Sequence, residues 1–291
     1  MTESINALLI FCEGPHDIAY VRMVMQKLLY FEKEEVLFKE LPSPFHKLLK
    51  QTVNTHAAKE LHLDMAHKFF LPDTILRNGN HLMLLFNCGG KGQYDKVRTL
   101  ISDYIPAMKV APRLAEGTKE VVDSIRYLFV YDADAEGIEG IIKSVNNNFS
   151  SINNASFINT EWKKSSHSDF GRVAGDKAVY VWGENPARGT LEDILIPLFT
   201  KDQKTLMGDA KAAVVKMFPR DTGNADPAIA VPAMAKQSKS ILTLVGQGKK
   251  PGFSMSVIIE QAELLEDTTL KTDSTTKEFT NFVAEFIGLS V

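Results

Sequence analysis

The sequence predicts an α/β protein with a parallel central sheet and a C-terminal helical extension. Apolar, strand-like runs alternate with amphipathic helical segments as far as about residue 199, and only helical patterns follow. Polar residues stand at the point where each apolar run ends. A chain of 291 residues is long enough for one large domain or two ordinary ones. We therefore predict an α/β domain over residues 1–199, with a helical insertion near 43–72, and a helical region over 200–291.

The composition is typical of a soluble globular protein, with 44% hydrophobic and 24% charged residues. The six-residue apolar run before Glu13 is too short for a signal peptide or a membrane span, so we expect no membrane partner. Cys12 and Cys88 end apolar runs, which favours buried thiols over a disulfide and predicts a cytoplasmic protein. Because the net charge is −3, any contact with nucleic acid must be a local basic patch.

The first predicted strand, residues 8–12, runs into Glu13-Gly14-Pro15-His16-Asp17, and a helix follows. Pro15 suits the first turn of that helix. A second strand is predicted over residues 35–41, where prolines end it. A third, His81–Asn87, runs into Cys88-Gly89-Gly90-Lys91-Gly92 and a further helix.

The sequence YLFVYDADAEG, residues 127–137, predicts a buried strand followed by two carboxylates and a helix. A short strand is predicted over residues 178–182, preceded by an exposed loop over residues 161–177. Thr190 is expected to cap the next helix, with Asp193 at its third position. The last predicted helices cover about residues 201–218, 234–247, 253–265 and 275–289.

Carboxylates follow two strands that we expect in the same sheet. Side chains two apart on an extended segment point the same way, so Asp132 and Asp134 are expected to converge on one cation. The carboxyl ends of parallel strands share an edge, which predicts that Glu13 lies nearby. Such carboxylates are costly unless water, a metal or a cationic group meets them. Oxygen ligands favour hard cations, and the seven histidines form no HxxxH or HExxH pair that would indicate zinc.

Four short patterns occur in order along the chain, each just after an apolar strand or at a helix start. They are Glu13-Gly14 with Asp17, then Gly89-Gly90-Lys91, then Asp132-x-Asp134, and then Gly189-Thr190-Leu191-Glu192. This combination resembles the Toprim domain of topoisomerases, primases and the overcoming-lysogenization-defect (OLD) nucleases, and most of all the small stand-alone OLD-like Toprim proteins. The resemblance covers about residues 6–199 and implies a Rossmann-like Toprim fold.

The resemblance also implies roles for individual residues. Glu13 would be a general acid/base or metal ligand, Asp132 and Asp134 would hold Mg²⁺ or Mn²⁺, and Glu192 would add a further metal ligand, with Thr190 as the hydroxyl of the [ST]-x-E element. Asp17 is either a second ligand or a partner of the helix dipole. Glu192 is otherwise part of an ordinary capped helix.

Two lysine positions complete the predicted site. Lys91 would contact a phosphate cradled by the glycine loop, or else be a solvated lysine in a tight turn. The loop lacks the GxxxxGK[ST] spacing of a Walker A motif. OLD-type nucleases also use a late catalytic lysine, for which Lys236 and Lys239 both remain possible.

The function that these residues predict is a divalent-metal-dependent nuclease acting on DNA or RNA, with Glu13 and Lys91 catalytic and the acidic set binding Mg²⁺ or Mn²⁺. The alternative is a non-catalytic Toprim scaffold that binds nucleic acid or a separate ATPase subunit in phage defence. Clustered carboxylates, which repel phosphate, favour the nuclease. No separate domain for a nucleophilic tyrosine and no zinc module are evident, which argues against a topoisomerase and a full primase.

Overall fold

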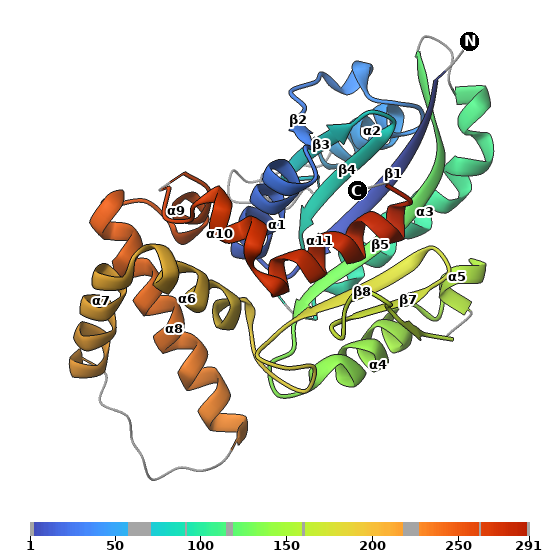
Figure 1. Ribbon diagram of the computed structural model, residues 1–291. Coiled ribbons are helices and arrows are strands. Elements are labelled where there is room, and N and C mark those ends of the chain that lie inside the picture. Colours follow the sequence, from blue (N-terminus) through green and yellow to red (C-terminus); the bar gives the residue numbers. More distant parts are fainter. Residues whose placement is uncertain are drawn as a thin grey trace.

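The computed structural model describes residues 3–57, 71–90, 92–114, 119–158, 161–217, 227–261 and 263–289, and it confirms the α/β class (Figure 1). The described strands form one eight-stranded sheet in the order β2-β3-β4-β1-β5-β8-β7-β6. They are β1 (Glu3–Cys12), β2 (Glu32–Lys33), β3 (Thr74–Asn78), β4 (His81–Asn87), β5 (Glu120–Asp132), β6 (Lys163–Lys164), β7 (Gly171–Ala174) and β8 (Lys177–Trp182).

The four central strands, β4-β1-β5-β8, are parallel, as predicted, and the outer strands on both sides are antiparallel. The predicted parallel sheet is therefore correct for the core only. Two of the antiparallel pairs, β3–β4 and β7–β8, are joined by two-residue turns, which reverse the chain directly. Gly79 and Asn80 join β3 to β4, and Gly175 and Asp176 join β7 to β8.

Helices pack against both faces of the sheet, so that the core has two layers (Figure 1). One layer contains α1 (Pro15–Leu28), α6 (Leu191–Asp202), α9 (Met255–Gln261), α10 (Asp267–Thr272) and α11 (Ser274–Ile287). Helices α7 (Lys204–Met217) and α8 (Pro227–Lys249) pack on each other and on α6, beside the sheet (Figure 1). The other contains α2 (Phe45–Ala57), α3 (Tyr94–Leu114), α4 (Gly137–Phe149) and α5 (Ala155–Ile158).

The neighbouring strands β1 and β5 send the chain to opposite faces. After β1 the chain enters α1 on one face, and after β5 it enters α4 on the other. In open α/β sheets, ligands bind outside the carboxyl ends of strands at such a point. The ends of β1 and β5 are therefore the place to look for a functional site.

Two predicted segments differ from the structure. Residues 35–41 do not form a strand. A short 3₁₀ helix, η1 (Phe38–Glu40), lies there, and its apolar neighbours Val36 and Leu37 are exposed. Within the predicted loop 161–177, β6 and β7 extend the sheet. The predicted helical insertion contains α2, and its residues 58–70 lie outside the described part of the chain.

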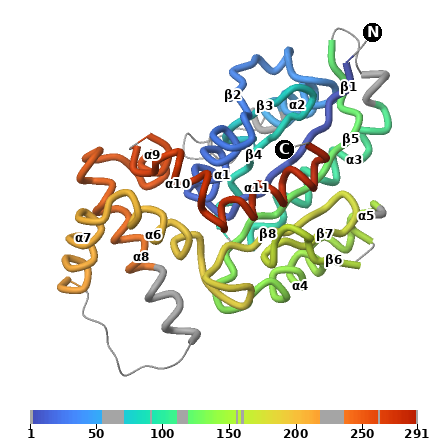
Figure 2. The backbone as a smooth tube through the Cα atoms, in the orientation of Figure 1, coloured from blue at the N-terminus to red at the C-terminus, as the bar shows by residue number. Residues whose placement is uncertain are grey.

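The C-terminal helices share the hydrophobic core of the sheet. The ring of Phe279 on α11 lies 4.6 Å from Trp182 and 4.7 Å from Tyr180, both on β8. Phe282 lies 5.3 Å from Tyr180. Helix α11 crosses the face of the sheet, as the backbone trace also shows (Figure 2). Helix α11 is thus part of the hydrophobic core of the α/β domain.

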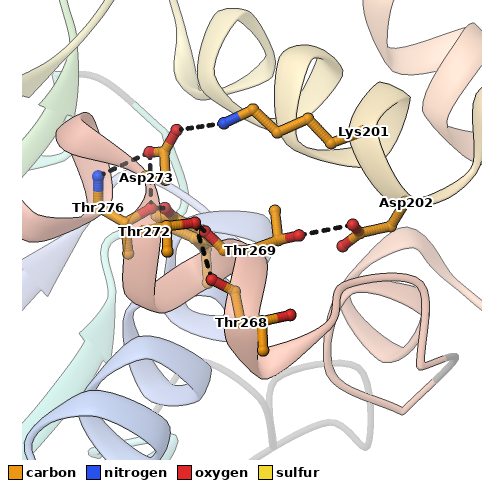
Figure 3. A network of polar contacts seen from close by, with 8 residues as sticks. Lys201, Asp202, Thr268, Thr269, Thr272, Asp273 and Thr276 are labelled. Atoms are coloured by element: carbon orange, nitrogen blue, oxygen red, sulfur yellow. Dashed lines mark hydrogen bonds and ion pairs between the residues drawn. The ribbon is translucent and has the colours of Figure 1, made fainter.

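Polar contacts connect α6, α10, α11 and α1 (Figure 3). Asp273 accepts hydrogen bonds from Lys201 Nζ at 3.2 Å and from the backbone nitrogen of Thr276 at 2.9 Å. The Thr276 hydroxyl lies 2.9 Å from the hydroxyl of Tyr20 on α1. Asp202 accepts from the Thr269 hydroxyl at 2.5 Å. These contacts fix α1 and α6 relative to each other, and both helices carry carboxylates of the predicted site.

Cys12 and Cys88 are buried free thiols, as predicted. Burial is the main cause that raises the pKa of Cys88, to about 12. Within the described residues, no helix is both long and apolar enough to cross a lipid bilayer.

Replacing Phe279 with alanine is expected to lower the free energy of unfolding by about 3–5 kcal/mol, because a buried ring is lost among other rings. Denaturant titration measures this change. Asn281→Ala, at an exposed position two residues along α11, is the matched control and should change stability by less than about 0.5 kcal/mol. Equal effects of the two substitutions would show that α11 does not contribute to the core as described.

Candidate functional site

Glu13 and Asp17 lie where β1 gives way to α1. Glu13 directly follows the strand, and Asp17 stands in the first turn of the helix. The backbone nitrogen of Gly14 donates to Asp17 Oδ2 at 2.9 Å, so this oxygen caps the helix start. The side chain is only 6% exposed, and its other oxygen, Oδ1, is buried with no hydrogen-bond partner. Asp17 therefore fulfils its capping role with one oxygen and leaves the other available.

Asp132, the last residue of β5, connects three elements of the site. Its backbone nitrogen donates to Glu13 Oε2 at 3.4 Å. Its Oδ1 accepts a hydrogen bond of 2.8 Å from the backbone nitrogen of Leu191, the first residue of α6. The carboxylate of Asp132 thus meets a helix N-terminus, where the helix dipole favours negative charge.

Glu192 is the second residue of α6 and is only 2% exposed. Its Oε1 lies 3.7 Å from Lys239 Nζ, and its Oε2 is buried without a hydrogen-bond partner. The predicted cap of α6 is present, because the backbone nitrogen of Thr190 donates to Asp193 Oδ2 at 2.7 Å. Asp193, not Glu192, supplies the cap, which leaves the burial of Glu192 unexplained by helix capping.

The carboxylates influence one another's ionisation. Burial is the main cause that raises the pKa of Asp17 to about 7, and the neighbouring charges of Glu13 and Glu192 add to it. Burial likewise raises the pKa of Asp132, followed by the effects of Asp17, Glu192 and Glu13. Burial also raises the pKa of Glu192, against the opposing effects of Lys239 and a Thr190 hydrogen bond. These four side chains therefore form one electrostatic unit, which we call the carboxylate cluster: Glu13, Asp17, Asp132 and Glu192.

Of the two late lysines, the structure brings Lys239 to the carboxylate cluster. Burial lowers its pKa, but the carboxylates, Glu192 first, outweigh burial and raise it. Lys236, one turn earlier on α8, is exposed. His16 also faces this region, because burial and then the charge of Lys239 lower its pKa. From the sequence alone, Lys236 and Lys239 were equally good candidates for the late catalytic lysine, because their spacing on one helix does not show which of them faces the sheet.

Asp134 lies two residues beyond the end of β5. The strand β5 ends at Asp132, and Asp134 has a left-handed backbone with φ of 48°. Its backbone nitrogen donates to Gly189 O at 2.7 Å, and Gly189 N donates back at 2.9 Å. The alternation of side chains applies along an extended strand and not beyond its end, so the convergence of Asp134 with Asp132 on one cation stays a prediction. The two backbone hydrogen bonds of Asp134 hold the loop after β5 against the loop before α6.

The glycine loop after β4 lies beside Glu13. The backbone nitrogen of Gly90 donates to Glu13 O at 2.9 Å, and that of Gly89 donates to Asn87 Oδ1 at 2.9 Å. The sequence suggested that this loop cradles a phosphate. These two backbone donors are used within the protein and are therefore not free for that role. Lys91 lies outside the described residues.

Within the described ranges, no three His, Cys, Asp or Glu side chains are arranged as a ready-made metal site. The donor chemistry nevertheless fits a hard cation. Four carboxylates meet one ammonium group, and two buried carboxylate oxygens, on Asp17 and Glu192, have no hydrogen-bond partner. Such an excess of buried negative charge must be relieved by protons or by a cation.

The overall fold resembles that of a hypothetical protein from Pyrococcus horikoshii OT3, known from a crystal structure. The two chains share 15% identity with a TM-score of 0.50, and the match covers 98% of this chain and 96% of the other. At this identity the likeness concerns the fold alone. No protein-family model and no curated protein matches the sequence.

Proposed function

We propose that this protein is a divalent-metal-dependent phosphodiesterase of the Toprim type, which cleaves nucleic acid at the carboxylate cluster. The observation that carries the proposal is the burial of Glu192 and Asp17 with unpartnered oxygens beside two further carboxylates. A purely structural role does not account for such a cluster, because unpaired buried charges destabilise a fold. Perturbed pKa values that cluster at one sheet edge are typical of functional sites.

The carboxylates Asp17, Asp132 and Glu192 are the residues that would hold Mg²⁺ or Mn²⁺. Mg²⁺ characteristically uses one or two protein carboxylates and completes its shell with waters and substrate phosphates, so a ready-made set of three is not required. When bound, the metal would supply charge neutralisation at the phosphate and lower the pKa of water. Asp134 is a further candidate ligand from the sequence pattern.

Two residues of the chain have proposed roles besides metal binding. Glu13 is only partly buried and adjoins the other carboxylates, so it can accept a proton from an attacking water. Lys239 keeps its proton because the carboxylates raise its pKa, and its ammonium can neutralise charge on a phosphate oxygen. Lys91, which belongs in sequence to the glycine loop after β4, is a second candidate for phosphate contact.

Calorimetric titration of Mn²⁺ and Mg²⁺ into the wild type and Asp132→Asn tests the proposal. We expect saturable binding by the wild type, at least about tenfold weaker binding by the variant, and metal-dependent cleavage of DNA or RNA by the wild type alone. Asp123→Asn, an exposed aspartate at the other end of β5, is the matched control and should behave as the wild type.

Two results would contradict the nuclease. No binding of metal in the presence of nucleic acid would remove the basis of the catalytic role. Tight binding of nucleic acid without metal-dependent cleavage would favour the scaffold alternative, in which the protein binds nucleic acid or a partner ATPase.

A further inference from the structure

The turn between α8 and α9 presents an aromatic side chain to solvent beside two lysines. This turn, Lys249-Lys250-Pro251-Gly252-Phe253, keeps Phe253 49% exposed. The ammonium of Lys250 lies 5.5 Å from the centre of the Phe253 ring. A single exposed apolar residue is common on protein surfaces, but this ring follows two consecutive lysines on a chain of net charge −3.

Gln247 holds the turn in one shape. Its Nε2 donates to Phe253 O at 2.9 Å, and its Oε1 accepts from Gly252 N at 2.6 Å. Gly252 has φ of 83°, which a residue with a side chain would adopt only with strain. Because the turn is already ordered, covering the ring with a ligand would cost little further conformational entropy.

The turn lies at the end of the helix that supplies Lys239 to the carboxylate cluster (Figure 1). Lys239 lies ten residues before Lys249, the last residue of α8, which is about 15 Å along the helix axis. Gly246, which lies between them, is packed against Ile258 of α9, where a Cβ would come within 2.3 Å of its side chain. This close contact fixes the turn relative to the helix.

We propose that the Lys249–Phe253 turn, which we call the aromatic turn, binds single-stranded nucleic acid, with Phe253 stacked on an unpaired base and Lys249 and Lys250 beside the flanking phosphates. The proposal deepens the nuclease function and rests on it, because a strand held at this turn would extend from there to the carboxylate cluster. The carboxylates repel a polyanion, so a substrate needs positive contacts elsewhere, and the lysines of the turn supply them. A duplex does not offer a base face without unstacking.

Fluorescence anisotropy with a labelled single strand of about 12 nucleotides, in the presence of a chelator to prevent cleavage, tests the aromatic turn. Separate DNA and RNA strands show which nucleic acid is bound. We expect Phe253→Ala to weaken binding about 5- to 100-fold and Phe253→Trp to restore it, since every base stacks on either ring. The variant Lys249→Gln/Lys250→Gln should reduce the salt dependence of binding, by about one or two units in the logarithmic slope.

Phe38→Ala is the matched control, because Phe38 is 41% exposed but lies on η1 and not on this turn. Its binding should equal that of the wild type, and all variants should keep the wild-type melting temperature. If the wild type binds single strands and Phe253→Ala binds them equally well, the aromatic turn is not a contact, while the nuclease proposal stands. If the wild type neither binds nor cuts single strands or duplexes, the nuclease proposal fails and the turn proposal fails with it.

Discussion

Asp17→Asn is expected to stabilise the metal-free protein at about pH 8 and to remove its stabilisation by Mn²⁺. The asparagine oxygen can still accept the hydrogen bond from Gly14, so the cap of α1 is kept. The substitution removes a carboxylate whose pKa is about 7 in the fold, chiefly because of burial and then of Glu13. The free energy gained is on the order of a few kcal/mol, which corresponds to several degrees in Tm.

The pH dependence has a definite sign. The folded state holds a proton on Asp17 up to about pH 7, whereas the unfolded chain releases it near pH 4. The wild type should therefore lose stability as the pH rises from about 4 to about 7, and change little above that range. Asp17→Asn should lack this loss, so the two melting curves coincide at low pH and separate as the pH rises.

Bound Mn²⁺ should oppose the loss in the wild type, because it replaces the proton as the neutralising charge. The matched control is Asp123→Asn, where an exposed carboxylate is removed and the wild-type pH profile should persist. The measurement is the melting temperature across this pH range, with and without Mn²⁺. If Asp17→Asn followed the wild-type curve, the proposed role of Asp17 in the carboxylate cluster would be contradicted.

The core of the fold was predictable from the sequence because each central strand contains a continuous apolar run. The runs that end at Cys12, Asn87 and Trp182 are buried on both faces, so neither periodicity nor composition is ambiguous there. The edges were missed because their strands are short and partly exposed. The signal was present in the Gly79-Asn80 and Gly175-Asp176 turns, each of which is a two-residue hairpin connection.

The carboxylate cluster was predictable in part, since parallel strands bring their carboxyl ends to one edge. That rule placed Glu13 near Asp132, and the structure links them through a hydrogen bond. The rule does not extend past the end of a strand, so it gives no direction for the side chain of Asp134, which lies beyond β5. The identity of the late lysine depends on how α8 packs, and this packing is set by contacts such as Gly246 with Ile258 that no local pattern reveals.

Lys239→Met is expected to lower cleavage about 100-fold or more, whereas Lys236→Met should leave it unchanged. The two lysines lie one turn apart on the same helix and are both exposed, so the pair compares an ammonium at the carboxylate cluster with one away from it. Only Lys239 approaches Glu192, at 3.7 Å. Initial rates of cleavage, measured for both variants at saturating Mn²⁺, give the comparison. Equal losses in the two variants would contradict a specific role for Lys239.

A second measurement separates a role in catalysis from a role in the fold. Removing the ammonium leaves the carboxylates with more negative charge, so Lys239→Met should bind Mn²⁺ at least as tightly as the wild type while cutting more slowly. A merely structural defect would instead weaken both. Because Lys239 opposes the burial that raises the pKa of Glu192, the variant should also lose stability at alkaline pH in the absence of metal. Slower cleavage with weaker metal binding would therefore indicate that Lys239 organises the cluster rather than contacts the phosphate.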